Sequence, residues 1–251
     1  MEFAADEECN DDATLRRRFS WRVRSCAREE LLLQLLPRNR AVRAVVDELL
    51  GAGNVGFTPP GYYSGDFSAD FSAEKTRGIY AVMPYDRPRT RLQLHNDSTL
   101  ESRDRVSCVG YIDNVPPGGG GFGVWPGTHR SCWNKIDHWE ERRRHDLDAV
   151  PIDAPALVHE WESIVSSVHP VDCAGKAGDV VFYHSRLGHH AGQNYSASIR
   201  LAVLTEFALT PQALPDSQLR SAACMREDIW YGWSARVRQA ADDQAATAAR
   251  L

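Results

Sequence analysis

Residues 91–98 of the chain read RLQLHNDS, an alternation of polar and apolar side chains. This period indicates a β-strand, because successive side chains of a strand point to opposite faces of the sheet. The two leucines would then face a core, while Gln93, His95 and Asp97 would share the opposite face. An imidazole and a carboxylate on one face can bind the same ion, so the stretch predicts a strand that ends in a metal site.

A second histidine-rich stretch strengthens this prediction. A His-x-Asp pair is weak evidence by itself, since a chain with nine histidines can contain one by chance. Residues 178–200, however, read GDVVFYHSRLGHHAGQNYSASIR and supply further histidines and an arginine. Two histidines and one carboxylate form the facial triad of non-haem Fe(II) oxygenases, which leaves coordination positions open for a 2-oxoacid and O₂. The planar fork of an arginine suits the far carboxylate of 2-oxoglutarate.

Composition and charge exclude several other classes of protein. The chain of 251 residues is 43% hydrophobic and carries a net charge of -5, so we expect a packed core and no nucleic-acid partner. No apolar run is long enough to predict a membrane span. The acidic start without an apolar stretch and the six scattered cysteines favour a cytoplasmic protein with reduced thiols. The last three residues, Ala-Arg-Leu, bear a slight similarity to a peroxisomal address.

The pattern along the chain predicts α+β architecture around an antiparallel sandwich or barrel. We expect an acidic flexible tail at 1–12 and a single domain over 13–251. Within that domain the predicted segments are helices at 28–36 and 37–50, a Gly/Pro-rich loop at 51–76, short strands over 77–208, a charged helical insertion within 131–165, and a C-terminal helix at about 216–248.

Three stretches in this order resemble the phytanoyl-CoA dioxygenase family of Fe(II)/2-oxoglutarate oxygenases. They are HND at 95–97, GGGGFGVWPGTHR at 118–130, and the histidine-rich residues 178–200. The resemblance implies a double-stranded β-helix, that is, a jelly-roll or cupin-like core at about 77–208, flanked by helices.

The resemblance also assigns roles to individual residues. It implies that His95, Asp97 and His189 are the iron ligands and catalytic residues, and that Arg200 binds 2-oxoglutarate. The family often has a serine where this chain has Ala191. Gln93 is therefore a candidate for contacting the co-substrate.

Two other histidines of the same stretch keep alternative interpretations. His190 is the alternative distal ligand, although on an extended segment it would point away from the side that His189 faces. His184 either supports the site or is a buried core histidine with both ring nitrogens satisfied.

The implied reaction uses Fe(II), 2-oxoglutarate and O₂ to hydroxylate or desaturate a C–H bond of a small organic metabolite, with release of succinate and CO₂. Related halogenases are expected to lack the carboxylate ligand, so Asp97 favours hydroxylation over halogenation. One alternative is a cupin-like metal-dependent isomerase or hydrolase that uses no 2-oxoglutarate and has no need of Arg200. Another is a non-catalytic binding module with the same fold. No motif identifies the substrate.

Overall fold

The computed structural model describes residues 20–53, 55–57, 72–84, 105–131, 163, 167–210, 229, 230 and 232–248. Gln93, His95 and Asp97 lie outside this part of the chain, as do the acidic tail and nearly all of the predicted insertion. Nothing below concerns their structure.

The described helices and strands have the following bounds. The helices are α2 (Glu30–Leu35), α3 (Arg40–Leu50), α4 (Thr128–Ser131) and α8 (Ala235–Ala248). The strands are β1 (Ser20–Val23), β2 (Val55–Phe57), β3 (Ile79–Val82), β4 (Arg105–Tyr111), β5 (Phe122–Val124), β6 (Val171–Cys173), β7 (Val180–His184), β8 (His189–Ala191) and β9 (Arg200–Leu209).

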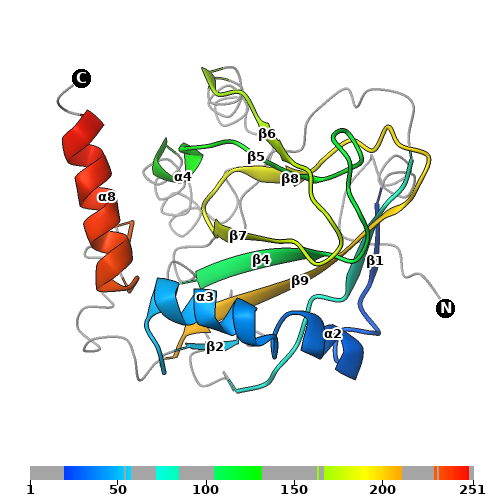
Figure 1. Ribbon diagram of the computed structural model, residues 1–251, viewed down its shortest axis with the longest axis horizontal. Helices are drawn as coiled ribbons and strands as arrows, with labels where there is room; N and C mark the ends of the chain where they lie inside the picture. Colours follow the sequence, from blue (N-terminus) through cyan, green and yellow to red (C-terminus); the bar gives the residue numbers. More distant parts are fainter. Residues whose placement is uncertain are drawn as a thin grey trace, which may run out of the picture.

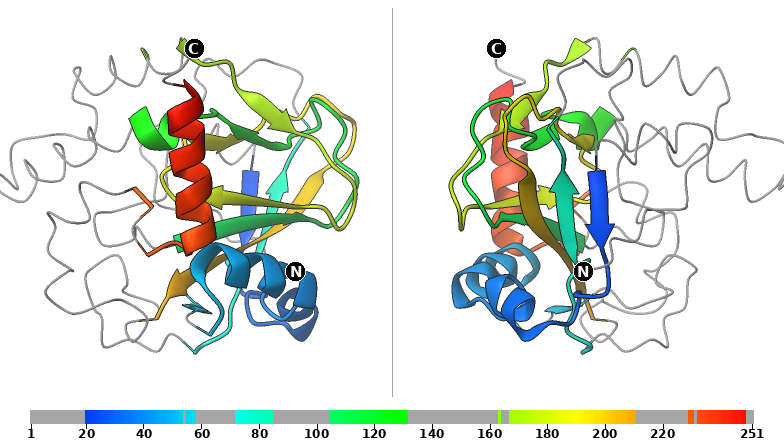
Figure 2. Two further views of the ribbon diagram at one scale, coloured as in Figure 1. Left: turned by 60° about the vertical axis from the view of Figure 1, so that its left-hand side comes forward. Right: turned by 90° about the vertical axis from the view of Figure 1, so that its right-hand side faces the viewer.

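The strands form two antiparallel sheets, which confirms the predicted α+β class. The large sheet has the order β1-β3-β9-β4-β7, with β2 also paired to β9. The small sheet has the order β6-β5-β8. In Figure 1 the small sheet lies above the large one, α2 and α3 lie below the large sheet, and α8 stands at one end. Figure 2 shows the same layers from two other sides.

The two faces of the large sheet bury separate cores. On strand β4, Cys108 belongs to a core that α2 and α3 share with the sheet. The neighbouring Val109 and Tyr111 belong to a second core, which includes Phe122 of the small sheet. This alternation follows from the period of two in a strand. The interior between the two sheets is therefore lined by Tyr111 and by side chains on the same face of the large sheet.

Helix α3 illustrates how well the helical pattern could be read. The side chain of Asn39 caps it by accepting hydrogen bonds from the backbone N–H groups of Ala41 and Val42. Val42, Val46 and Leu50 recur at helical spacing and are buried, so this face anchors the helix to the large sheet. Both predicted N-terminal helices are confirmed.

Several segments differ from the sequence-based expectation. Strand β2 lies within the predicted loop at 51–76, because pairing with β9 stabilises a strand of three residues that is too short to show a period. Helix α8 begins at Ala235 and follows turns at residues 229, 230 and 232 and a bend at 233, where the prediction had a helix, whereas the predicted start at about 216 lies outside the described residues. Ser234 marks the start, and its hydroxyl accepts a long hydrogen bond from the N–H of Val237.

Two predictions of absence can be compared with the described residues. The thiols of Cys26, Cys108 and Cys173 in this part of the chain form no disulfide. Among the described helices, none combines the length and apolarity that crossing a bilayer requires.

Candidate active site

Of the predicted site residues, the structure describes His189 and Arg200. His189 is the first residue of β8 in the small sheet, and Arg200 is the first residue of β9 in the large sheet. His95, Asp97 and Gln93 lie outside the described residues, so their arrangement around these two remains a prediction. Within the described part of the chain, no group of three or more histidine, cysteine, aspartate or glutamate side chains could hold a metal ion.

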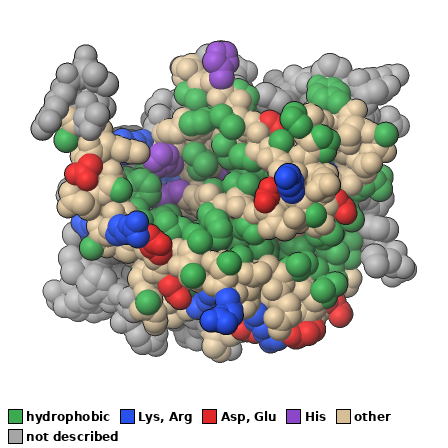
Figure 3. All heavy atoms as spheres, in the orientation of Figure 1, with side chains coloured by type: hydrophobic (Ala, Val, Ile, Leu, Met, Phe, Trp, Pro, Cys, Tyr) green, Lys and Arg blue, Asp and Glu red, His purple; other side chains and the backbone are tan. Residues whose placement is uncertain are grey.

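The imidazole of His189 lies in the interior between the sheets. Its ring packs at centroid distances of 5.0 Å from Phe122 and 4.8 Å from Tyr183, and the residue is only 3% exposed. Phe122 and Tyr183 both belong to the core between the sheets. On the face drawn in Figure 3, histidine side chains lie in a hollow among apolar ones, between α8 and the sheets.

One ring nitrogen of His189 has a fixed role. Its Nδ1 lies 2.8 Å from the carbonyl oxygen of Leu187, which can only accept a hydrogen bond. Nδ1 therefore carries the proton in the neutral ring, and Nε2 presents its lone pair. Metal-binding histidines commonly donate their second N–H to a backbone carbonyl in this way. The chemistry of this side chain thus fits an iron ligand.

His190 points to the opposite face of the small sheet, as the alternation of a strand requires. Its ring lies 4.9 Å from that of Trp125, which is fully buried. The ring of His190 covers Gly123, the residue of β5 that pairs with it. A Cβ added at Gly123 would lie 2.2 Å from the Nε2 of His190. His189 and His190 therefore occupy different environments, and only His189 faces the interior between the sheets.

The turn at residues 125–128 holds the start of β8. The hydroxyl of Thr128 donates to the carbonyl of Trp125 at 2.7 Å and accepts from the N–H of Gly188 at 2.9 Å. The N–H of Trp125 also donates to the carbonyl of Gly188. Sequence reasoning missed Thr128, although the stretch GGGGFGVWPGTHR contains it. Because Gly188 directly precedes His189, this turn fixes the backbone of the candidate ligand.

Arg200 belongs to the same interior. It shares a face of β9 with Ala202, which lies in the core between the sheets, and it is 5% exposed. Its Nε–H donates to the carbonyl oxygen of Gly120 at 2.7 Å, and Nη1 lies 3.4 Å from the carbonyl oxygen of Tyr80. These contacts fix the plane of a buried guanidinium.

The glycine-rich turn at residues 118–121 brings the carbonyl of Gly120 to Arg200. Gly120 has a φ of +80°, and a Cβ there would lie 2.9 Å from the Cβ of Asn194. Asn194 in turn donates from its amide to the carbonyls of Val82 and Ser198. The turn thus packs directly against the segment that leads into β9.

Tyr111 joins the two sheets beside Arg200. Its hydroxyl donates to the carbonyl of Cys173 at 2.6 Å and accepts from the N–H of Phe122 at 2.8 Å. Burial raises the pKa of Tyr111, while the N–H of Phe122 and the charge of Arg200 oppose the shift. The phenol is therefore neutral. Its two hydrogen bonds connect β4 of the large sheet to β6 and β5 of the small sheet, a role that no sequence motif indicated.

Further contacts agree with the remaining interpretations. His184 is buried, and its two ring nitrogens contact the backbone N–H of Arg186 and the carbonyl of Ile229, so both are satisfied. Asp179 closes the turn before β7 by accepting from the N–H of Lys176. Ala191 pairs with Phe122 across the small sheet.

Comparison with known proteins identifies the family. The phytanoyl-CoA dioxygenase (PhyH) family model matches residues 61–202, more than half of the chain, and this range includes His95, Asp97, His189 and Arg200. The chain belongs to the phytanoyl-CoA dioxygenase family, as the sequence predicted. The predicted Fe(II), 2-oxoglutarate and O₂ are confirmed as the cofactors of this family of non-haem oxygenases.

The solved structures that match this chain are distant in sequence. AviO1 from Streptomyces viridochromogenes Tue57 is 21% identical, with 53% of this chain and 50% of that chain covered and a TM-score of 0.35. EctD from S. alaskensis with bound Fe is 15% identical, with 82% and 60% covered and a TM-score of 0.47. The non-heme alpha ketoglutarate dependent epimerase SnoN is 15% identical, with 82% and 59% covered and a TM-score of 0.39.

The chain spans about half to three fifths of the length of these three proteins. A search of curated proteins gave no match.

Proposed function

We propose that this protein hydroxylates or desaturates a C–H bond of a small organic molecule, with oxidation of 2-oxoglutarate to succinate and CO₂. The observation that carries the proposal is the orientation of the buried His189 ring, whose Nδ1–H donates to the carbonyl of Leu187, so that Nε2 is the nitrogen without the proton. Arg200, a buried cation on the other sheet, faces the same interior.

The proposed iron ligands are His95, Asp97 and His189. The first two rest on the HND motif, and the third also rests on the environment of its ring. Asp97 would supply the one negative charge among the protein ligands. The imidazole of His190 is not assigned a ligand role, because it packs on Trp125 at the opposite face of the small sheet.

We further propose that the two sheets belong to a double-stranded β-helix. Such a fold distributes eight strands over two sheets. The neighbours β3, β9, β4 and β7 fit one of these sheets, and β6, β5 and β8 fit the other. The strand that the sequence predicts to end in His95 and Asp97 lies outside the described residues.

Arg200 separates this proposal from its main alternative, a cupin-like isomerase or hydrolase without 2-oxoglutarate. A guanidinium that is buried beside the interior core must be paired with acceptors to be stable. Its Nε–H donates to the carbonyl of Gly120 and its Nη1 to the carbonyl of Tyr80, and we assign the far carboxylate of 2-oxoglutarate as a further acceptor of this guanidinium when the co-substrate is bound. Since Ala191 has no hydroxyl, Gln93 remains the proposed additional contact to the co-substrate.

The protein's own contribution is positioning and exclusion of water. Bound iron, with 2-oxoglutarate and O₂, supplies the oxidation of the C–H bond. Phe122 and Tyr183 enclose the ring of His189 and keep it buried, and the hydroxyl of Thr128 holds the adjacent backbone. An apolar and preorganised surrounding favours a reaction whose intermediates must not meet water.

The test is succinate formation stimulated by a substrate. Purified protein with Fe(II), 2-oxoglutarate and O₂ is incubated with fractionated small-molecule pools, and succinate and the mass of the product are measured. A gain of one oxygen, or a loss of two hydrogens, coupled to succinate supports the proposal, and Asp97→Ala should abolish it. A substrate converted without consumption of 2-oxoglutarate would instead establish the isomerase or hydrolase alternative.

A further inference from the structure

The buried histidine at the end of β7, His184, is bonded to the backbone through both ring nitrogens. The N–H of Arg186 donates to Nδ1 at 3.0 Å, so Nδ1 is an acceptor. The proton of the neutral ring then lies on Nε2, which is 3.3 Å from the carbonyl oxygen of Ile229. One imidazole thus connects the β7–β8 loop to a segment more than forty residues later in the chain.

That later segment packs on the same ring. Trp233 stacks on His184 at a centroid distance of 5.2 Å and an interplanar angle of 7°, and Trp230 meets it edge-on at 5.5 Å. Trp233 is buried, and the next residue, Ser234, donates its N–H to the carbonyl of Leu49. The segment is therefore fixed both to His184 and to helix α3.

The same histidine also leads to the candidate iron ligand. Its carbonyl oxygen accepts from the N–H of Leu187 at 2.8 Å, and the carbonyl of Leu187 accepts from Nδ1 of His189 at 2.8 Å. Two consecutive peptide N–H groups, those of Arg186 and Leu187, are thus held by His184. The carbonyl that orients His189 belongs to the second of these residues.

We propose that His184 is a positioning residue that transmits the docking of the segment at 229–233 to the imidazole of His189. The ring of His184 holds the peptide at Arg186, its own carbonyl holds the peptide at Leu187, and the Leu187 carbonyl sets the ring of His189. The inference rests on the proposed function insofar as His189 is the iron ligand. The inference goes beyond the proposed function, because it gives His184 and the segment around Trp230 and Trp233 a role in the metal affinity of the site.

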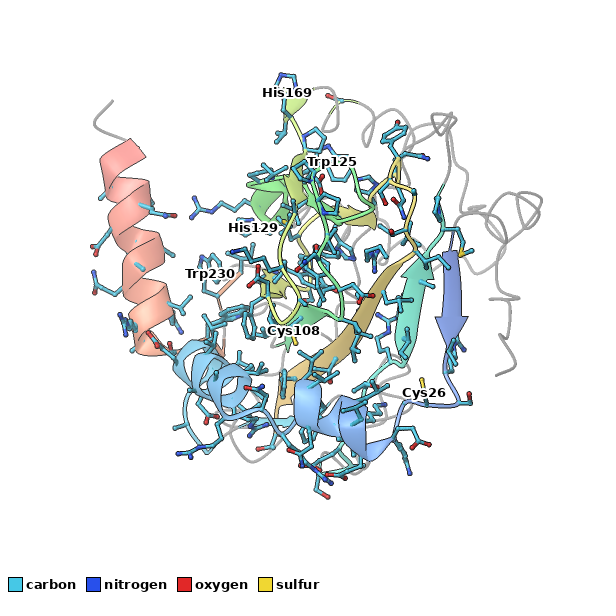
Figure 4. The ribbon with its side chains drawn as sticks, turned by 45° about the vertical axis from the view of Figure 1, so that its right-hand side comes forward. Cys26, Cys108, Trp125, His129, His169 and Trp230 are labelled. Carbon is cyan, nitrogen blue, oxygen red and sulfur yellow. The ribbon has the colours of Figure 1, made fainter. Side chains whose placement is uncertain are left out.

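The main variant removes the two hydrogen bonds of the His184 ring and keeps an aromatic side chain at this position. His184→Phe retains the stack on Trp233 and loses both bonds, and His184→Asn restores an acceptor for Arg186. His129→Phe is the matched control, because His129 packs on both His184 and Trp230 at centroid distances of 5.8 and 5.5 Å, yet lies outside the path to His189. Figure 4 shows His129 and Trp230 beside one another.

Two readouts are measured on folded protein, without turnover. The first is the affinity for Co(II), a spectroscopic substitute for Fe(II), and the second is the ¹⁵N NMR signal of the His189 ring in the metal-free protein. We expect His184→Phe to weaken Co(II) binding about tenfold or more, as loss of a contact that orients a ligand commonly does. The His189 signal should move away from the pure Nδ1–H form. His184→Asn should recover part of both effects, and His129→Phe should change neither.

The outcomes separate the positioning role from the proposed function. If His184→Phe has a lower Tm but unchanged Co(II) affinity and His189 signal, His184 only packs and the proposal is overturned. If His184→Phe fails to fold, Trp233→Phe takes its place, with the same two readouts and the same criterion. If wild type binds no Co(II), the proposed function fails, whereas the His189 signal of the metal-free variants still decides whether His184 orients that ring.

Discussion

The Nδ1 atom of His189 lies 2.8 Å from the carbonyl oxygen of Leu187, two residues earlier in the chain. The contact assigns the proton of the neutral ring to Nδ1, so in the proposed iron site Nε2 would be the coordinating nitrogen. Because Leu187 precedes β8, the orientation of this ring depends on the β7–β8 loop as well as on the strand itself. A ligand held by its neighbouring backbone keeps its orientation before the metal binds.

Replacing Arg200 should affect 2-oxoglutarate specifically. Removing one partner of a desolvated charge pair typically costs about 2–5 kcal/mol, which corresponds to roughly thirtyfold weakening or more at about 1.4 kcal/mol per tenfold. We therefore expect Arg200→Ala to raise the KM for 2-oxoglutarate by at least this factor. Arg200→Lys should restore part of the loss, because an ammonium cannot reproduce the planar fork.

Thermal stability serves as the control for Arg200, since its Nε–H also bonds to Gly120. A lower Tm together with an unchanged KM in the surviving folded protein would show that Arg200 is purely structural. That result would favour the alternative without 2-oxoglutarate.

Gly123 and His190 should be energetically coupled. A Cβ at Gly123 would lie 2.2 Å from the Nε2 of His190, and that ring is confined by the buried Trp125. Gly123→Ala should therefore destabilise the protein by about 1–3 kcal/mol, the usual cost of overpacking. In the double variant with His190→Ala much of this cost should disappear, which denaturant unfolding of all four proteins would measure. Strictly additive effects would mean that His190 does not occupy this space.

The hydroxyl of Thr128 should contribute to stability more than its methyl group does. Thr128→Val keeps the shape but leaves the buried N–H of Gly188 without its acceptor, at a cost of about 1–3 kcal/mol. Thr128→Ser keeps the hydroxyl and should lose less. Urea unfolding of the three proteins compares them, and equal losses for the two variants would contradict the bridging role.

His129 should make the protein less stable in mild acid. Burial, and to a lesser extent Arg130, lowers its pKa from 6.5 to about 4. Between these values the unfolded chain binds a proton that the folded protein does not, so stability is full above about pH 6.5 and falls as the pH decreases toward 4. At about 1.4 kcal/mol per pKa unit, reduced for partial exposure, the loss amounts to about 2 kcal/mol. His129→Phe should show a flatter dependence of unfolding free energy on pH over this window, and an equal slope in both proteins would contradict it.

Sequence patterns predicted those helices and strands whose residue pattern runs over many consecutive positions. The period of helix α3 and the strand-like composition of β4 and β9 extend over enough residues to be read directly. The choice of His189 over His190 came from the family motif. The structure adds a physical reason, because Phe122 and Tyr183 surround one ring while Trp125 and Gly123 receive the other.

Contacts made by the backbone could not be read from side-chain patterns. Strands β2, β6 and β8 have three residues each, so pairing with their neighbours defines them and their own period does not. Likewise, the carbonyl of Leu187 orients His189 whatever the side chain at that position. The hydrogen bond between the ring of His184 and the carbonyl of Ile229 depends on packing between segments that are distant in the sequence, and no local motif predicts such packing.

The central claim is that His189 binds Fe(II), which in turn binds 2-oxoglutarate. Under anaerobic conditions, chelation of Fe(II) by a 2-oxoacid gives a visible charge-transfer absorption, and we would titrate 2-oxoglutarate into the Fe(II)-loaded protein. We predict a saturable band for wild type and for His190→Ala, and none for His189→Ala. A band that survives in His189→Ala but is lost in His190→Ala would contradict the assignment of the ligand, and no band in wild type would contradict the account as a whole.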